Sequence, residues 1–242
     1  MARVSVRCGI AVASIGFCLT ALAGCQLTGA GPAMEAAPAA PLTTPLTTSP
    51  TTPLAGVIGV WMTLEDGIDL IARTSPDLKE SNVIIHVARR VVTPDGAGGP
   101  TGFIIFRPDL AAAPVVAGFI GADARLGSYS AKKIFAGTPF EKLPVIPATI
   151  EIDTSKLPGT VSTRVTVSGH VFEVQMDALG PLAFINRTPA GMPPFAQQGL
   201  ESVAGKTTLK VDGKPFDIIV PQTGVTKGPA ATYSPAGIYA RN

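Results

Sequence analysis

The clearest alternation of apolar and polar residues along the chain lies in Thr163–Val174. The pair Ser168-Gly169 in its middle favours a two-residue hairpin turn. Such a turn gives two informative cross-strand pairs: Val165 with Phe172, which is apolar, and Arg164 with Glu173, which is an ion pair. The segment is therefore predicted to form an antiparallel hairpin with one buried face and one face in water.

A second hairpin is predicted at Thr207–Val220, where Asp212-Gly213 is a favoured type I′ turn pair. This turn places Leu209 opposite Phe216. Pro215 cannot donate a backbone hydrogen bond, which indicates an edge strand. Because an edge strand offers unpaired backbone groups, the segment Pro215–Val220 is the first place where we expect a partner strand to add.

Three earlier segments have less decisive patterns. Val83–Val92, the glycine-rich connection 93–100 and Gly102–Phe106 are interpreted as strand, loop and strand. Alternatively, Ser75-Pro76-Asp77 begins a helix that runs into this region. Leu64–Ile68 contains Asp66-Gly67, which fits either another hairpin or one short helix.

Near the middle of the domain, Ala148–Asp153 is predicted to be a strand, and Lys156–Gly159 a turn. The last twenty residues are rich in Gly, Pro, Thr and Ala, and are predicted to be loosely ordered. Together these segments predict a mainly β fold for residues 57–242: one antiparallel β-sandwich or open barrel with hairpins and one or two short helices.

The composition changes before residue 57. Residues 26–56 contain a Pro/Thr-rich stretch with almost no charge. Proline removes backbone donors and favours extended backbone. Residues 25–56 are therefore interpreted as a semi-rigid tether, of about 3 Å per residue where it is extended.

The first 24 residues have the organisation of an export signal. Arg3 and Arg7 precede an uncharged apolar run from Gly9 to Leu22, which is shorter than the about 20 residues of a membrane-spanning helix. The run ends in Leu22-Ala23-Gly24-Cys25. This motif resembles the lipobox of bacterial lipoproteins, and the resemblance covers residues 1–25 only.

The lipobox resemblance implies cleavage before Cys25 and a diacylglycerol on its sulfur. The membrane is then one partner of the protein, through that lipid. Gln26 follows the cysteine in place of Asp, and this resemblance to sorted lipoproteins favours the outer membrane if the cell has two membranes.

The other two cysteines, Cys8 and Cys18, leave with the signal. The mature domain therefore has no thiol for a disulfide, a metal site or a nucleophile. Removing Arg3 and Arg7 from the 19 basic residues leaves 17, equal to the 17 acidic residues. A mature chain without net charge and without a clustered basic surface is not expected to bind nucleic acid.

Candidate chemistry is sparse, and no cofactor is predicted. His86 and His170 are the only histidines; His86 is expected on the polar face of a strand and His170 at an exposed turn, without a metal role for either. Ser130-Ala131-Lys132-Lys133 matches the S-x-x-K pattern of penicillin-binding enzymes. The glycine after Lys206-Thr207 that the pattern needs is absent, so a loop is favoured for residues 130–133.

These observations favour a lipid-anchored binding or assembly module of the cell envelope, with an envelope protein or polymer as its partner. The alternative is an envelope hydrolase with a serine or carboxylate site. A carrier of a hydrophobic ligand is a weaker alternative, because a β-sandwich or open barrel can enclose one.

Overall fold

A computed structural model describes residues 59–188, 194–225 and 227–241 of the 242-residue chain. The predicted signal, Cys25 and the tether lie outside the described residues. Twelve strands are present in the described part: β1 (Val60–Ala72), β2 (Val83–Thr93), β3 (Gly96–Gly98), β4 (Thr101–Phe106), β5 (Val116–Gly121), β6 (Val145–Asp153), β7 (Thr160–Val167), β8 (His170–Leu179), β9 (Ala183–Arg187), β10 (Ala196–Val211), β11 (Lys214–Phe216) and β12 (Ala231–Arg241). The helical elements are α1 (Ala124–Tyr129), the π-helical turn η1 (Ser130–Ile134) and the 3₁₀ turn η2 (Pro139–Lys142).

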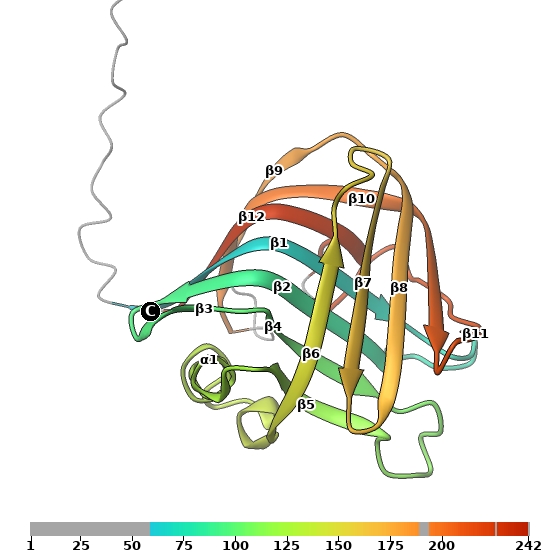
Figure 1. Cartoon of the computed structure of the whole chain (residues 1–242), viewed down its shortest axis with the longest axis horizontal. Coiled ribbons are helices and arrows are strands. Elements are labelled where there is room, and N and C mark those ends of the chain that lie inside the picture. Colours follow the sequence, from blue (N-terminus) through green and yellow to red (C-terminus); the bar gives the residue numbers. More distant parts are fainter. Residues whose placement is uncertain (1–58, 189–193, 226, 242) are drawn as a thin grey trace, which may run out of the picture. The chain divides into compact units, whose positions relative to one another are not determined.

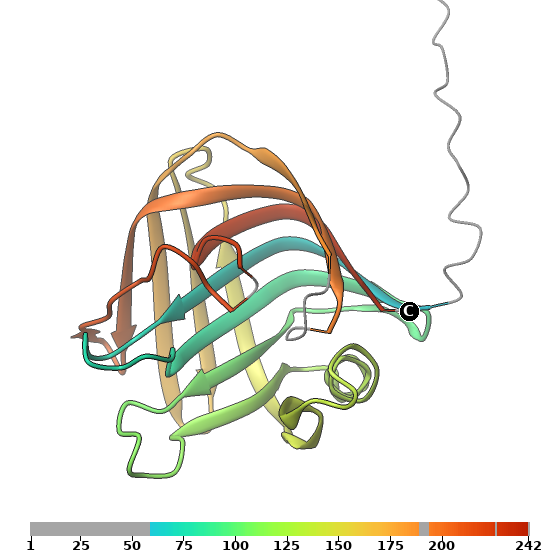
Figure 2. The ribbon, with the colours of Figure 1, turned by 180° about the vertical axis from the view of Figure 1, so that it is seen from behind.

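The strands form one large sheet, and the predicted mainly β, largely antiparallel fold is confirmed. Neighbours follow the order β1-β12-β10-β8-β7-β6-β5-β4-β2, and β2 pairs back with β1, so the sheet closes on itself. All these pairs are antiparallel except β5 with β6. In Figures 1 and 2, β6, β7 and β8 cross the direction of β10, β12, β1 and β2. The 16-residue β10 pairs with β12 along its first half and with β8 along its second half, and so connects the two parts.

Both predicted hairpins are confirmed. β7 and β8 pair in the predicted register, with Val165 opposite Phe172 and Arg164 opposite Glu173. In β10 and β11, Leu209 lies opposite Phe216. β11 is an edge strand of three residues, as Pro215 indicated, but it ends at Phe216. Beyond β11, Ile219 forms an isolated bridge with Arg73, so this residue of the expected free edge is already paired.

Three expectations near the ends of the domain are wrong. The last residues are not loosely ordered, because β12 (Ala231–Arg241) lies between β1 and β10. The alternative helix from Ser75 does not form, and residues 74–82 contain turns and irregular backbone. Asp66-Gly67 forms neither a hairpin nor a helix, because β1 continues through both residues. The strand Ala148–Asp153, the turn that follows it and the strand-loop-strand interpretation of 83–106 are confirmed.

Buried side chains form two groups on the two faces of the closed sheet. The inner core receives side chains from all nine strands of the ring, including Ile68, Phe172 and Tyr233. The outer cluster joins β1, β2, β4, β5 and β12 to the helical segment, through residues such as Met62, Phe119 and Leu126. The apolar side chains therefore stabilise two layers.

β1 exchanges its two faces at Asp66. Met62 and Ile68 are six residues apart, a spacing that places both on the same face of a regular strand. Met62 nevertheless belongs to the outer cluster and Ile68 to the inner core. Asp66 lies between them with a φ of +50°, in the left-handed region. This exchange brings Asp69 to the outer face of the sheet.

The helical segment exists because β5 and β6 are parallel. Two parallel neighbours need a crossover of about a dozen residues or more, since a tight turn cannot join them. Residues 122–144 form this crossover and carry α1, η1 and η2. The segment lies beside β5 at one end of the sheet (Figures 1 and 2) and covers part of its outer face. Within the described residues, no helix is long and apolar enough to cross a bilayer.

Candidate functional site

A cavity of about 130 Å³ lies between the outer face of the sheet and the crossover. Its apolar walls come from three sources. The sheet contributes Met62, Ile71, Ile84 and Phe103; the crossover contributes Ile134, Phe135 and Phe140; two connecting segments contribute Phe195 and Val225. Three polar residues on the sheet side, Asp69, His86 and Tyr239, also line the cavity.

The strand register brings Asp69 and His86 together. They lie directly opposite each other in the β1–β2 pair. Asp69 Oδ1 lies 2.5 Å from His86 Nδ1, and the two side chains are 23% and 18% exposed. The hydrogen bond on Nδ1 directs the other ring nitrogen, Nε2, away from Asp69, and Nε2 forms no hydrogen bond within the described residues.

The charge state of His86 depends on opposing effects. Burial lowers the pKa of the imidazole, whereas the negative charge of Asp69 and the hydrogen bond to it raise it. The net effect is a pKa of His86 above its ordinary value of 6.5. Near neutral pH, the protonated imidazole therefore gains population, and in that form Nε2 is a hydrogen-bond donor.

Tyr239 lies on β12 opposite Met62 and packs edge-on against His86, with ring centroids 5.9 Å apart. The residue is 6% exposed. Burial raises the pKa of its phenol well above 10.0, and the negative charges of Asp69 and Glu201 raise it further, against the opposing effect of Arg187. The phenol is therefore neutral at physiological pH and remains a hydrogen-bond donor.

The hydroxyl of Tyr239 forms no hydrogen bond with the described part of the chain. Across these residues, Arg73 Nε is the one fully buried side-chain nitrogen or oxygen atom that lacks a partner. The Tyr239 hydroxyl therefore keeps some accessible surface, and the cavity is the space that this side chain lines. A donor that keeps accessible surface and has no protein partner can donate to water or to a ligand.

An ion pair between Arg187 and Glu201 lies close to Tyr239. Arg187 on β9 forms two parallel hydrogen bonds with Glu201 on β10, of 2.7 and 2.5 Å. Gln197 donates to Glu201 and accepts from Arg187, at 3.1 and 3.0 Å. The hydrogen bond with Glu201 raises the pKa of Arg187 above its ordinary value. Because the two charges satisfy each other, this pair leaves no net charge beside the cavity.

The crossover is held in place by its caps. Asp123 accepts a hydrogen bond from the backbone N–H of Arg125 and caps α1. The Thr138 hydroxyl caps η2 by accepting from Phe140, and it donates to the Phe135 carbonyl at 2.7 Å. Thr138 thus fixes the backbone at both of the phenylalanines that the crossover places in the cavity wall.

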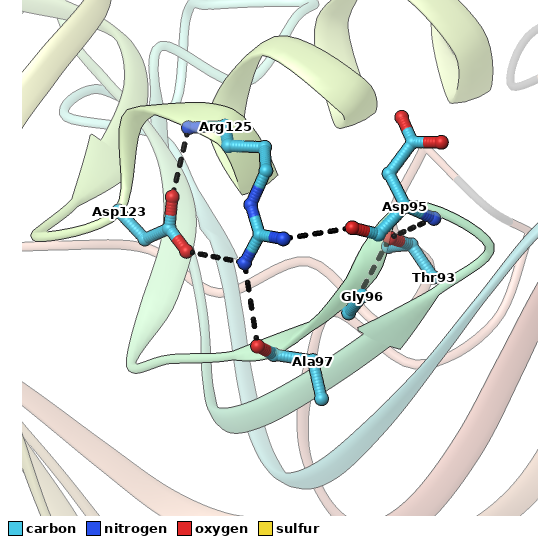
Figure 3. Close-up of polar contacts among 6 residues, drawn as sticks. All are labelled: Thr93, Asp95, Gly96, Ala97, Asp123 and Arg125. Carbon is cyan, nitrogen blue, oxygen red and sulfur yellow. Dashed lines mark hydrogen bonds and ion pairs between the residues drawn. The ribbon is translucent and has the colours of Figure 1, made fainter.

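A clasp around Arg125 ties the crossover to the sheet (Figure 3). The guanidinium donates to the carbonyl of Asp95 at 2.7 Å, to the carbonyl of Ala97 at 3.5 Å and to the Asp123 carboxylate at 3.0 Å. The Thr93 hydroxyl donates to the Gly96 carbonyl and so closes the turn between β2 and β3. The beginning of α1 is therefore attached to the β2–β3 turn.

The end of η1 is attached to β12. Arg241 on β12 donates to the carbonyls of Lys133, Ile134 and Ala136, at 3.2, 3.0 and 2.7 Å. Tyr129 donates to the Trp61 carbonyl of β1 at 2.9 Å. These contacts fix the crossover over the cavity at both of its helical ends.

The predicted loop at Ser130–Lys133 is wrong, because these residues form the π-helical turn η1 directly after α1. Ser130 is buried, and its hydroxyl contacts the Met62 sulfur at 3.5 Å. Lys133 is exposed. The structure thus separates the two residues of the S-x-x-K pattern between the interior and the surface. Lys206 lies on a different strand, β10.

The two histidines differ from each other in their surroundings. His170 lies beside the β7–β8 turn, as predicted, and its Nδ1 is 2.9 Å from Asp212 Oδ2. The hydrogen bond with His170 lowers the pKa of Asp212. His86 lies on a strand, as predicted, but the expected polar face is wrong: it faces the apolar cavity. No group of three or more potential metal ligands occurs in the described ranges.

Two other surfaces of the domain have some features of a binding site. A larger hollow of about 280 Å³ lies on the outer side of β6, β7 and β8, lined by charged residues that include Glu151, Arg164 and Lys210. It is open to solvent, as the wet face of the predicted hairpin should be. Leu182, Phe184, Leu200 and Val203 are exposed apolar residues at β9 and β10. Neither surface combines enclosure with convergent polar groups.

Residues of the cavity were missed in the sequence, although a signal existed. The β4 and β5 segments, TGFIIF and VAGFIG, are apolar at successive positions. Such runs are typical of strands covered on both faces.

Comparisons of the chain with protein families, curated proteins and solved structures found no match.

Proposed function

We propose that the protein is a lipid-anchored binding module of the cell envelope, and that its domain binds a small apolar ligand in the outer-face cavity. The observation that carries this proposal is the cavity itself, in which apolar walls surround the polar groups of Asp69, His86 and Tyr239. Apolar pockets with a few convergent polar groups are the common form of small-molecule sites. The cavity thus favours ligand binding, the alternative that the sequence supported least.

The anchoring part of the proposal is supported by the sequence alone. The lipobox-like Leu22–Cys25 and the Pro/Thr-rich tether lie outside the described residues. Cys25→Ser removes the sulfur that would carry the lipid, so we expect the variant to incorporate no labelled lipid in cells. Labelling of the variant equal to that of the parent would contradict lipid attachment at Cys25.

Ligand binding in the cavity can be tested with isopropylbenzene, an apolar probe without a hydrogen-bonding group. Ile84→Trp adds bulk to the cavity wall and should abolish binding to the full chain in a calorimetric titration. Thr166→Trp is the matched control, because residue 166 is exposed on β7 and distant from the cavity lining. Equal binding by both variants would contradict the proposal.

A hydrolase is a second candidate because one observation favours it. Asp69 orients His86, as the acid of a catalytic triad orients its base. Ser130 and His86 also line a small hollow of about 20 Å³. However, the Ser130 hydroxyl contacts Met62, and no hydrogen bond joins it to His86 in the described structure. A serine nucleophile needs a base within hydrogen-bond reach.

A serine-reactive fluorophosphonate separates the two candidates. The binding module predicts no covalent labelling of the chain, since Ser130 is buried and has no base. Covalent modification of Ser130, lost in Ser130→Ala, would establish the hydrolase and overturn the binding module.

A further inference from the structure

The size and wall chemistry of the cavity restrict its ligand to about one ring. The volume of about 130 Å³ is close to that of an engineered apolar cavity of about 150 Å³ that binds benzene in another protein. Phe103 and Phe135 stack at 5.9 Å between centroids, with 17° between their planes. Phe140 meets both rings edge-on, at 5.4 and 5.8 Å. Rings in such arrangements offer faces and edges to a further aromatic ring.

Two of the polar side chains that line the cavity carry hydrogen-bond donors. The Tyr239 hydroxyl is neutral and has no protein partner in the described part of the chain. His86 Nδ1 is occupied by Asp69, and in the protonated ring Nε2 is a second donor. Both side chains line the same cavity and pack against each other at 5.9 Å. The atom that best satisfies two donors is an acceptor oxygen on the ligand.

The charges beside the cavity exclude a strongly charged ligand. Asp69 pairs with His86, and Glu201 pairs with Arg187 through two hydrogen bonds. Each pair balances its own charge. A carboxylate in the cavity would have no cation of its own, and an ammonium would have no free anion. Burial of an unpaired charge is strongly unfavourable, so a neutral ligand is selected.

We infer that the cavity binds a neutral, single-ring aromatic molecule whose carbonyl oxygen accepts a hydrogen bond from Tyr239 Oη, with His86 Nε2 as the second donor. The inference rests on the proposed function, because it specifies the ligand of the same cavity. Acetophenone is a probe with this chemistry. Isopropylbenzene has a similar shape and no acceptor, and benzoate has an acceptor with a full negative charge.

The test compares these three probes by calorimetric titration of the full chain and of Tyr239→Phe. This variant removes one oxygen and keeps the ring that packs on Phe195 and His86. We expect Tyr239→Phe to weaken acetophenone about tenfold, the value of one good hydrogen bond, and to leave isopropylbenzene unchanged. Benzoate is expected to bind at least about tenfold more weakly than acetophenone to the parent chain.

The matched control is Tyr233→Phe, the same substitution on the same strand. Tyr233 belongs to the inner core and its hydroxyl donates to Asp66, so this variant should leave the affinity of both neutral probes unchanged. Acetophenone affinity that is the same in Tyr239→Phe and the parent overturns the inference, and benzoate binding as tight as acetophenone does so too. Isopropylbenzene that fails to bind the parent overturns the proposed function as well.

Discussion

The inner core and the outer cluster are built by the same strands, yet they differ in how they are filled. The inner core contains fully buried side chains such as Phe172, Ile68 and Leu70 from a closed ring of strands. The outer cluster is closed by one crossover of short helical turns, and a cavity with polar groups remains beneath it. The difference indicates that the inner layer provides most of the stability, while the outer layer contains the proposed binding site.

The difference in stability between the two layers can be tested by truncating one phenylalanine in each. Phe172 is fully buried and meets Phe106 edge-on at 5.1 Å, so Phe172→Ala should cost about 3–5 kcal/mol of unfolding free energy. Phe140 lines the cavity and is partly exposed, so Phe140→Ala should cost about 1–2 kcal/mol. Urea denaturation measures both values.

A substitution on the solvent-exposed face of β8 is the control, because it should change the free energy of unfolding only slightly. Glu173 forms an exposed ion pair with Arg164, so Glu173→Ala should cost no more than about 1 kcal/mol. If Phe140→Ala costs as much as Phe172→Ala, the outer layer carries a full share of the stability and the comparison fails.

The attachment of the crossover gives a smaller expected effect. Asp123 caps α1 and joins the Arg125 clasp, so Asp123→Ala should destabilise the crossover slightly, as loss of a helix cap does. The loss should be local: amide exchange should accelerate in residues 124–134 and stay unchanged in β7 and β8. Equal acceleration in both regions would show that the crossover is not a separately stabilised layer.

The smallest effect concerns pH. His86 has a folded-state pKa above 6.5, so its pairing with Asp69 stabilises the fold fully below pH 6.5, and this contribution is lost as pH rises through the folded pKa. Tyr239 stays neutral in this range, and Arg187 stays charged beside Glu201. The difference in unfolding free energy between the parent and His86→Gln should therefore shrink between pH 5.5 and 8.5.

His170→Gln is the control for the pH experiment, because it removes the other imidazole at an exposed turn. We expect this variant to keep the pH-dependent loss of stability seen in the parent. A parent whose stability relative to His86→Gln is independent of pH would contradict the Asp69–His86 pairing.

Local signals were sufficient to predict the hairpins but not the outer layer. The register at Ser168-Gly169 follows from a turn pair and an alternation within twelve residues. β12 contains Ser, Pro, Gly and three Ala among its eleven residues, and it becomes a strand because β1, some 170 residues earlier in the chain, pairs with it. Long-range pairing of this kind overrides local propensity.

The side of His86 could not be predicted for a related reason. Alternation in β2 places His86 on the face opposite Val83, Ile85 and Val87, but the crossover, a segment distant in the chain, covers that face. Asp66-Gly67 was interpreted as either a hairpin turn or one short helix, whereas Asp66 has a positive φ within the continuous strand β1. The positive φ of Asp66 and the exchange of faces in β1 were therefore not predicted from the sequence.

The most direct test of the two-layer account is an NMR measurement of nuclear Overhauser effects between bound isopropylbenzene and the phenylalanine ring protons of the full chain. The account predicts contacts to Phe103, Phe135 and Phe140, which line the cavity. Contacts to Phe106, Phe172 and Phe216, which pack together at the inner core, would contradict it.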